Sequence, residues 1–366
     1  MPNLVSSPTK PSTAEAAVGC GKEFVVTVAA KAGESAESLF SRLTTELKHR
    51  EGAILSLMIY GDVGARDQTT HVIRRYLGAI DWPILWVEGR SCNGAPLAGV
   101  QAFAIRGAEL ERVLVKGRVV GTVYQDGDSR HCLLAGIGPD NPGASHADQA
   151  YQTFENLSTA LDVVGFQLAD VARTWFYNDR LLDWYDTFNR VRTAYYSKKP
   201  FRSGSVPAST GVEGLNPLGA ALTIGAWAVQ RLNSNSRVEE VLSPLQCPAP
   251  NYGSSFSRAM EIDSAGRRRL LVSGTASIAP EGHTVWVGDI TKQVGLTMEV
   301  VEAILRSRRM GFGDVSRATA YFKDPTFSAA FDAWQKERGL ALPAVYVHCD
   351  ICRDDLLFEI ELDACR

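Results

Sequence analysis

The chain has 366 residues and a formal net charge of −3, and 45% of its residues are hydrophobic and 22% charged. These values are typical of a globular protein that is long enough for two or three cores. Because the sequence has no basic excess, a nucleic-acid partner is disfavoured. No apolar run approaches the roughly 20 residues of a membrane-spanning helix, so no membrane partner is expected.

Residues 1–22 predict a flexible tail, because they lack the charged region and the apolar region that together make a signal peptide. The seven cysteines are an odd number scattered over a long chain, which is typical of a protein in a reducing compartment. These two features together predict a cytoplasmic protein.

Residues 23–115 predict a first unit of strands and helices. Residues 23–29 alternate as a strand does, and residues 36–49 carry apolar side chains at helical spacing. A helix is also predicted at 68–77, with further strands at 54–60, 82–88 and 99–105.

Residues 116–232 predict a second unit with a similar order of elements. A loop rich in Gly, Pro and Asn at 138–143 leads into a helix at 148–164 that has one apolar face. A second helix is predicted at 182–196, and strands are predicted at 119–124, 131–137, 171–177, 206–212 and 220–229.

Residues 233–250 predict a linker, because the polar stretch at its start interrupts the apolar pattern. Residues 251–366 then predict a third unit with the same order of elements. Its helices are expected at 290–308 and 327–338, and its strands at 255–262, 270–278, 316–322, 345–349 and 356–362.

One pattern occurs twice in the chain. It consists of Gly-Phe followed by Asp-Val-x-Arg-x-x-x-Tyr, and it begins at Gly165 and again at Gly311. A fainter match indicates a third copy in the first unit. An internal repeat means that each copy is one structural unit, so the expected fold is α+β, with mixed sheets that carry helices on one face.

The end of the third unit, Phe358-Glu359-Ile360-Glu361 after a proline loop, resembles the small YjgF/RidA-type subunit. Those subunits form trimers whose sites lie in the clefts between neighbours. The resemblance therefore implies fused YjgF/RidA-like repeats that form a monomer with internal pseudo-three-fold symmetry.

Several motifs, together with this arrangement, resemble the chorismatases, which release pyruvate from chorismate. The resemblance is good over residues 115–366 and weak in the N-terminal third. It implies a small-molecule substrate, chorismate, and no cofactor. The motifs are Tyr151-Gln-Thr-Phe-Glu-Asn-Leu, Arg173-Thr-Trp-Phe-Tyr, Trp184-Tyr-x-x-Phe-Asn189-x-x-Arg192, Ser209-Thr-Gly211, Ser255-Phe-Ser-Arg258-Ala and Ser273-Gly-Thr-Ala276-Ser.

Alignment of the copies by their last strands indicates that only one cleft keeps an acid. The position of Glu359 is held by Thr223 in the second copy and by Gly99 in the first. Imine deaminases of the YjgF/RidA type also carry an arginine just after the loop proline. Here alanine follows both Pro207 and Pro343, so imine deamination is disfavoured.

Glu359 is the predicted general acid. Cleavage of the enol ether of chorismate needs a proton on the terminal methylene carbon, and Glu359 lies between Phe358 and Ile360. Burial among apolar residues raises the pKa of a carboxyl group and keeps it protonated near neutral pH. Glu361, which points to the same face of the strand, is the second candidate. The alternative is that Glu359 only pairs with an arginine.

Cys352 lies seven residues before Glu359. The resemblance implies that a cysteine here marks the chorismatase branch that forms 3-hydroxybenzoate, while 4-hydroxybenzoate and a dihydroxycyclohexadiene acid stay open as products. Cys352 could guide proton removal, exclude water, or be a small buried apolar residue. Cys349-x-x-Cys352 leads out of a strand and has no second Cys or His pair, so no metal site is predicted.

Arg258 and Arg173 are the predicted clamps for the two substrate carboxylates, although either could instead be a surface residue. Tyr195 is a predicted donor to a carboxylate, with core packing as the alternative. The other predicted substrate-binding residues are Ser209, Thr210, Gly211, Gly274 and Ala276. The rival functions are a chorismate hydrolase and a non-catalytic YjgF-like binding protein.

Overall fold

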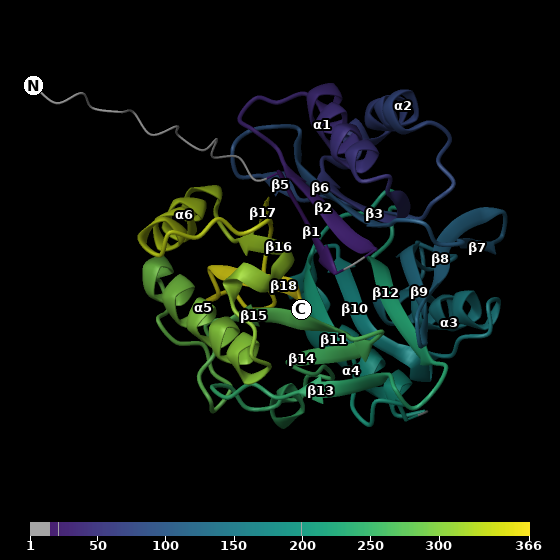
Figure 1. The fold of residues 1–366 in the computed structure, drawn as a ribbon. Coiled ribbons are helices and arrows are strands. Elements are labelled where there is room, and N and C mark those ends of the chain that lie inside the picture. The colour runs from purple at the N-terminus through teal and green to yellow at the C-terminus, as the bar shows by residue number, and fades with distance from the viewer. Residues whose placement is uncertain (1–14, 21, 199) are drawn as a thin grey trace, which may run out of the picture.

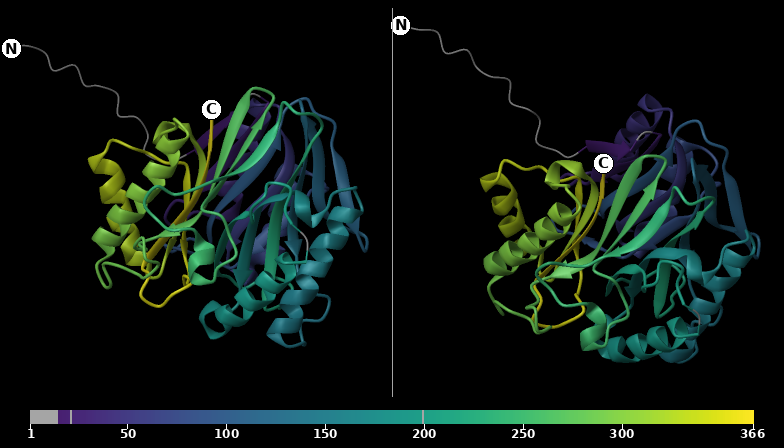
Figure 2. Two further views of the ribbon diagram at one scale, coloured as in Figure 1. Left: turned by 90° about the horizontal axis from the view of Figure 1, so that it is seen from below. Right: turned by 60° about the horizontal axis from the view of Figure 1, so that its bottom comes forward.

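A computed structural model of the chain describes residues 15–20, 22–198 and 200–366. Within these residues the strands form three sheets, of five, six and seven strands. Each sheet contains one parallel pair among antiparallel ones, so all three are mixed. Figures 1 and 2 show the strands in the middle of the molecule and the helices on its periphery. The predicted α+β fold is confirmed.

The first sheet has the strand order β1-β2-β6-β3-β4. Residues 15–20, which the sequence assigns to a flexible tail, form β1 and pair antiparallel with β2, so the tail prediction is wrong for them. Residues 1–14 and 21 of the predicted tail lie outside the described residues, and Lys22 is described. The elements are β1 (Glu15–Cys20), β2 (Glu23–Ala29), α1 (Ala36–His49), β3 (Ala53–Gly61), α2 (Arg66–Leu77), β4 (Ile84–Val87) and β6 (Leu97–Ile105).

The second sheet has the order β11-β10-β12-β9-β8-β7. Its edge strand is β7, which the sequence analysis assigns to the first unit. In the structure β7 forms a hairpin with β8 and therefore belongs to the second sheet. Parallel strands need a crossover, and α4 is the crossover between β10 and β11. The elements are β7 (Glu111–Val115), β8 (Arg118–Asp126), β9 (Ser129–Ile137), α3 (His146–Asp162), β10 (Val171–Asn178), α4 (Leu181–Tyr196), β11 (Ala208–Glu213) and β12 (Leu222–Arg231).

The third sheet has the order β13-β14-β15-β18-β16-β17-β5. The predicted linker is not wholly irregular, because it contains β13, which pairs with β14. At the other edge, the short strand β5 of the N-terminal third pairs with β17. The elements are β5 (Arg90–Ser91), β13 (Arg237–Val241), β14 (Ala259–Ser264), β15 (Arg267–Ala276), α5 (Ile290–Ser307), β16 (Val315–Phe322), α6 (Ser328–Glu337), β17 (Ala344–His348) and β18 (Phe358–Cys365).

Five single-turn 3-10 helices complete the described fold. They are η1 (Val63–Ala65), η2 (Leu168–Asp170), η3 (Ala249–Tyr252), η4 (Phe312–Asp314) and η5 (Pro325–Phe327). The predicted domain boundaries stay a prediction. The strands β5 and β7 both pair outside the unit to which the sequence analysis assigns them.

Three buried tyrosines, one from each sheet, meet where the sheets converge. The hydroxyl of Tyr177 lies 3.0 Å from that of Tyr60 and 3.1 Å from that of Tyr321. Each tyrosine is paired across its sheet with the last strand of that unit. The paired residues are Gly99, Thr223 and Glu359, respectively, which is the alignment of last strands that the sequence predicts.

None of the described helices combines the length and the apolar character needed to cross a bilayer. Five described cysteines carry free thiols: Cys92, Cys132, Cys247, Cys349 and Cys352. Cys365 is disulfide-bonded, which departs from the expectation of reduced cysteines.

Candidate active site

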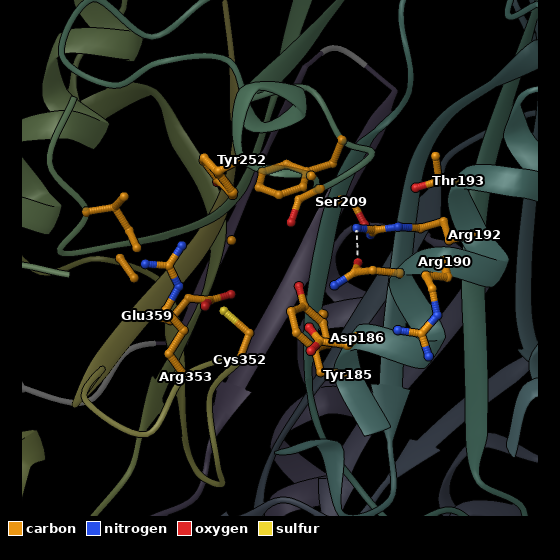
Figure 3. Close-up of a pocket in the computed structure, with 18 of the residues that line it drawn as sticks. Tyr185, Asp186, Arg190, Arg192, Thr193, Ser209, Tyr252, Cys352, Arg353 and Glu359 are labelled. Carbon is orange, nitrogen blue, oxygen red and sulfur yellow. Dashed lines mark hydrogen bonds between the residues drawn. The ribbon is translucent and has the colours of Figure 1, made fainter. Parts of the chain in front are cut away.

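A pocket of about 730 Å³ opens between the second and third sheets. This volume is in the usual range for a small-molecule site. The third unit supplies one wall, with Glu359 on β18 and Cys352 in the preceding loop, and helix α4 supplies the opposite wall (Figure 3). Ser209, at the start of β11, lies between the two walls.

The carboxyl group of Glu359 lies directly against the backbone of Gly274. A Cβ atom at position 274 would overlap Glu359 Oε1, so only glycine leaves room for the acid there. The pairing of β15 with β18 shifts register between Val272 and Thr275, which places a bulge at Gly274. Bulges of this kind redirect groups at functional sites. The glycine and the bulge together make the space that Glu359 occupies.

Glu359 is 5% exposed, and its carboxyl group has no hydrogen-bond partner among the described residues. Burial and the charge of Glu361 raise its pKa to about 8, although Arg173 and Arg258 act in the opposite direction. A carboxyl group with this pKa is protonated at neutral pH and can donate a proton.

Glu361, the second candidate acid, is enclosed in an ion-pair network. Its carboxylate accepts hydrogen bonds from Arg173 Nη2, from Arg317 Nη1 at 3.0 Å and from Thr210 Oγ1 at 2.5 Å. Burial favours its neutral form, but the guanidinium groups of Arg317 and Arg173 hold the pKa of Glu361 below its ordinary value. Glu361 is therefore ionised and does not line the pocket.

This network also corrects the role predicted for Arg173. Its side chain is fully buried, and its guanidinium group binds Glu361 and Thr210 rather than facing the pocket. Arg173 is therefore not placed to clamp a substrate. The surface position that the sequence left open for it is also wrong.

Arg258 and Arg192 are two buried cations that do line the pocket. They are 3% and 2% exposed, and neither forms an ion pair with any carboxylate of the described chain. Arg258 Nη2 and Arg192 Nε are buried without a hydrogen-bond partner. Both guanidinium groups lie over the ring of Phe256, at 5.5 Å and 6.0 Å from its centroid.

Buried charges without partners are rare, because desolvation of an ion is unfavourable unless something compensates for it. Two such arginines in one pocket therefore indicate a ligand with two anionic groups. The formal charge of the pocket agrees with this reading. Arg190, Arg192, Arg258 and Arg353 line it against Asp186 and Glu359, so its formal charge is +3 while Glu359 is protonated.

Cys352 points toward the Glu359 carboxyl group (Figure 3). Burial and the nearby carboxyl group of Glu359 raise the pKa of the thiol to about 12, so Cys352 is a neutral thiol. Tyr185 faces it from α4, and burial raises the pKa of that phenol as well. The space beside the acid is therefore lined by neutral, weakly polar groups.

The pocket brings together most of the predicted substrate-binding residues. Ser209, Gly211, Gly274 and Ala276 line it, and their binding of substrate stays a prediction. Thr210 does not line it, since its buried hydroxyl belongs to the Glu361 network.

Tyr195 is also outside the pocket. Its hydroxyl lies 2.9 Å from Ser158 Oγ, and its ring stacks on Phe154 at 5.1 Å. The packing alternative is therefore the correct one for Tyr195, because the helical turn points it toward α3 rather than toward the cleft.

Sequence reasoning missed the pocket residues of α4, although some of them belong to a motif quoted for the resemblance. Among these, Tyr185, Asn189 and Arg192 follow helical spacing and share one face of the helix. Asn189 Oδ1 accepts a hydrogen bond of 2.7 Å from Arg192 Nη2, which orients that guanidinium group. Helical periodicity applied to this motif could have found them. Tyr252 and Phe256 contact Arg258 from the end of η3 and from the loop before β14, and no periodicity marks either residue. The strand predicted at 255–262 begins only at Ala259.

No cluster of three or more His, Cys, Asp or Glu side chains in the described parts of the chain is arranged to hold a metal ion.

Comparison with known proteins found no protein-family model that matches the chain. A 3-hydroxybenzoate synthase from Streptomyces hygroscopicus is 26% identical over 263 residues, which are 64% of this chain and 74% of that protein. A chorismatase from Streptomyces rapamycinicus is 27% identical over 254 residues, which are 62% of this chain and 73% of that protein.

A chorismatase crystal structure shares the fold with a TM-score of 0.64 at 18% identity, over 94% of this chain and all of that one. The resemblance to chorismatases that the sequence predicts is confirmed in sequence by the two Streptomyces proteins and in fold by this structure.

Proposed function

We propose that the protein is a chorismatase, an enzyme that cleaves the enolpyruvyl ether of chorismate and releases pyruvate. The observation that carries this proposal is the presence, in one pocket, of one protonated acid and two buried arginines that have no carboxylate partner in the described chain. Glu359 lies on one side of the pocket, and Arg192 on α4 lies on the other. The names of the two similar Streptomyces proteins support the same substrate.

The two arginines match the two carboxylates of chorismate. Each guanidinium group offers N–H donors in a planar fork that binds a carboxylate, and each has at least one buried N–H that is unused in the protein. Arg192 is oriented by Asn189, and Arg258 by the carbonyl of Cys247, to which its Nε donates at 3.0 Å. The substrate supplies the negative charges that the pocket lacks.

Glu359 would then act as the general acid. It donates its proton to the terminal methylene carbon of the enol ether, and an oxocarbenium ion forms at the adjacent carbon. The pKa of about 8 makes the group protonated at neutral pH, and it remains a strong enough acid to give the proton up. No redox cofactor is required, because pyruvate and a hydroxybenzoate together contain the atoms of chorismate.

We further propose that the aromatic product is 3-hydroxybenzoate. The neutral thiol of Cys352 and the ring of Tyr185 line the space beside the acid, which disfavours a water molecule as the nucleophile. The ring hydroxyl of the substrate would then react internally, and the ring would aromatise. Attack by water would instead give the dihydroxycyclohexadiene acid, and 4-hydroxybenzoate is the other isomer that this cleft could form.

The test is incubation of the purified protein with chorismate. Pyruvate is measured by a coupled lactate dehydrogenase assay, and the ring product is identified by chromatography against authentic hydroxybenzoates and the diene diol. Equal amounts of pyruvate and 3-hydroxybenzoate are expected. Pyruvate with the diene diol would indicate a hydrolase. Chorismate binding without pyruvate would indicate a binding protein and would contradict the proposal.

We also propose that the working form is a monomer, since one chain already contains three sheets around one axis. Light scattering of the eluting protein during gel filtration would measure its mass, for which the monomer value is 39.8 kDa.

A further inference from the structure

Thr210 is predicted from the sequence to bind substrate, but its hydroxyl is fully engaged inside the protein. Thr210 Oγ1 donates to Glu361 Oε2 at 2.5 Å. It accepts from Arg173 Nη2 at 2.7 Å and from the backbone N–H of Gly274 at 3.1 Å. A hydroxyl group has one donor and two acceptor positions, so no capacity is left for a ligand.

The hydrogen bond from the Gly274 N–H links Thr210 to the backbone beside Glu359. The bulge in β15 turns this N–H away from the ladder with β18, and Thr210 on β11 of the other sheet accepts it. The same glycine supports the Glu359 carboxyl group, which occupies the place of a Cβ atom there. Without the threonine hydroxyl, this buried N–H would need another acceptor. The adjacent acceptor is Glu359.

The second link is electrostatic. Thr210 helps to hold Glu361 together with Arg173, so that Arg173 Nη2 donates to Glu361 and Thr210 and not to Glu359, although the charge of Arg173 still lowers the pKa of Glu359. Other titratable groups surround Glu359 on every side. They are Glu361 on the same strand, Tyr321 opposite on β16, Arg173 on β10, Tyr185 on α4, Arg258 before β14, and Cys349, Cys352 and Arg353 in the loop before β18.

We propose that Thr210 is a positioning residue for the acid: its hydroxyl binds the Gly274 N–H and the Arg173–Glu361 pair, and so keeps from Glu359 the donors that would stabilise its carboxylate. The proposal rests on Glu359 being the acid of the proposed function. In this arrangement the neutral, proton-donating form of Glu359 is maintained by a side chain that touches neither the substrate nor the acid's proton.

The test compares Thr210→Val with the matched control Thr210→Ser. Valine has the shape of threonine without the hydroxyl, and serine keeps the hydroxyl. Profiles of kcat/KM against pH are measured for chorismate cleavage by both variants and the wild type. For Thr210→Val, the midpoint at which activity is lost on the alkaline side is expected to move down by about 1 to 2 pH units, the effect of one hydrogen bond to a charged group. For Thr210→Ser the midpoint is expected to stay in place, and KM should change little in either variant.

A second measurement does not depend on catalysis. The titration of Glu359 is followed by carbon NMR of protein labelled at the glutamate carboxyl carbons, with the signal assigned by its loss in Glu359→Gln. The same downward shift is expected in Thr210→Val alone. If the wild type releases no pyruvate, the proposed function fails while this titration still tests Thr210. An unmoved titration in Thr210→Val, or an equal shift in Thr210→Ser, would overturn the role of Thr210 even in an active enzyme.

Discussion

The cleft between the second and third sheets and the cleft between the third and first sheets are built from equivalent strands with different side chains. In the first of these clefts, Thr210 on β11 lies near Glu359 and Gly274. In the other, the residue equivalent to Thr210 in strand pairing is Val345 on β17. A Cβ atom at Gly99, the position equivalent to Glu359, would meet the Val345 side chain at 2.9 Å.

The remaining interface, between the first and second sheets, also has an apolar side chain at the position equivalent to Thr210. The residue equivalent to Thr210 there is Leu85 on β4, which packs against Gly225. Thr223 occupies the position of Glu359, and its hydroxyl donates to the carbonyl of Ile137 at 3.2 Å. The strand position equivalent to Thr210 is thus aliphatic at two interfaces and polar at one, although a pocket of about 720 Å³ also lies between the first and third units. Only the cleft between the second and third sheets carries an acid at the position of Glu359. The candidate site is therefore distinguished by its polar and acidic side chains rather than by open space between the repeats.

The largest expected effect comes from removal of Glu359, the acid that distinguishes the cleft between the second and third sheets. Glu359→Gln keeps the shape and neutral charge of the protonated acid but has no proton to donate. Pyruvate release should fall by about 10³-fold, the usual contribution of a general acid, while chorismate binding by calorimetry stays nearly intact. The matched control is Thr223→Val, at the equivalent position of the second unit, which should leave turnover unchanged. Undiminished turnover in Glu359→Gln would contradict the assignment.

A second contrast separates the two kinds of buried arginine. Arg192→Met and Arg258→Met each remove a charged donor from the substrate and should weaken chorismate binding by roughly 30- to 1,000-fold. Because neither arginine has a carboxylate partner, these variants should melt no lower than the wild type.

Arg173→Met is the control for this contrast. It removes one of the two cations that hold Glu361, and so should lower the free energy of unfolding by about 3 to 5 kcal/mol. Calorimetric melting of the three variants checks the contrast. A large loss of stability in Arg192→Met with unchanged binding would mean that this arginine is structural.

The pH dependence of activity and stability follows from the raised pKa of Glu359. Activity should fall about tenfold per pH unit above pH 8, as the acid loses its proton. In the unfolded chain an ordinary glutamate, with a pKa of 4.5, is already ionised between pH 4.5 and 8. The unfolded state then binds fewer protons, so the free energy of unfolding should decrease as pH rises through this range. Glu359→Gln should lose this dependence, and its melting temperature relative to the wild type should therefore rise from pH 5 to pH 8. A constant difference would contradict the shift.

The smallest expected effect concerns the product rather than the rate. Cys352→Ala removes a side chain from the space beside the acid and admits water, so some dihydroxycyclohexadiene acid should appear beside 3-hydroxybenzoate. Total pyruvate should change little, because the protonation step does not involve the thiol. Chromatography of the products measures the ratio. An unchanged product would assign the cysteine a packing role only.

The fold was largely predictable because repeats and periodicity depend on local sequence. The register of Tyr177 with Thr223 and of Tyr321 with Glu359 agrees with the alignment made from sequence. The strand β13 lies in the predicted linker and was not predictable. Its sequence is polar and has no local strand pattern, and only the pairing with β14 makes it a strand.

The site was only partly predictable, because sequence separates lining residues from neighbours poorly. Ser209, Thr210 and Gly211 are consecutive, yet the first and last line the pocket and the middle one belongs to the buried network. Arg173 resembles Arg258 in sequence terms, but only the tertiary structure gives Arg173 an internal carboxylate. A charge is known to be free for a ligand only when its neighbours are known.

The short pairing of β5 with β17 joins the first third of the chain to the last, so the three units form a closed ring. Each unit therefore touches both others, and the covalent connections between units are not what brings the walls of the pocket together. The candidate active site is in this sense an assembly product, because its lining comes from the second unit, the third unit and the segment between them. Loss of any one unit would expose two interfaces at once, at least one of them apolar, so the intact ring is the smallest part of the protein that we expect to stay folded.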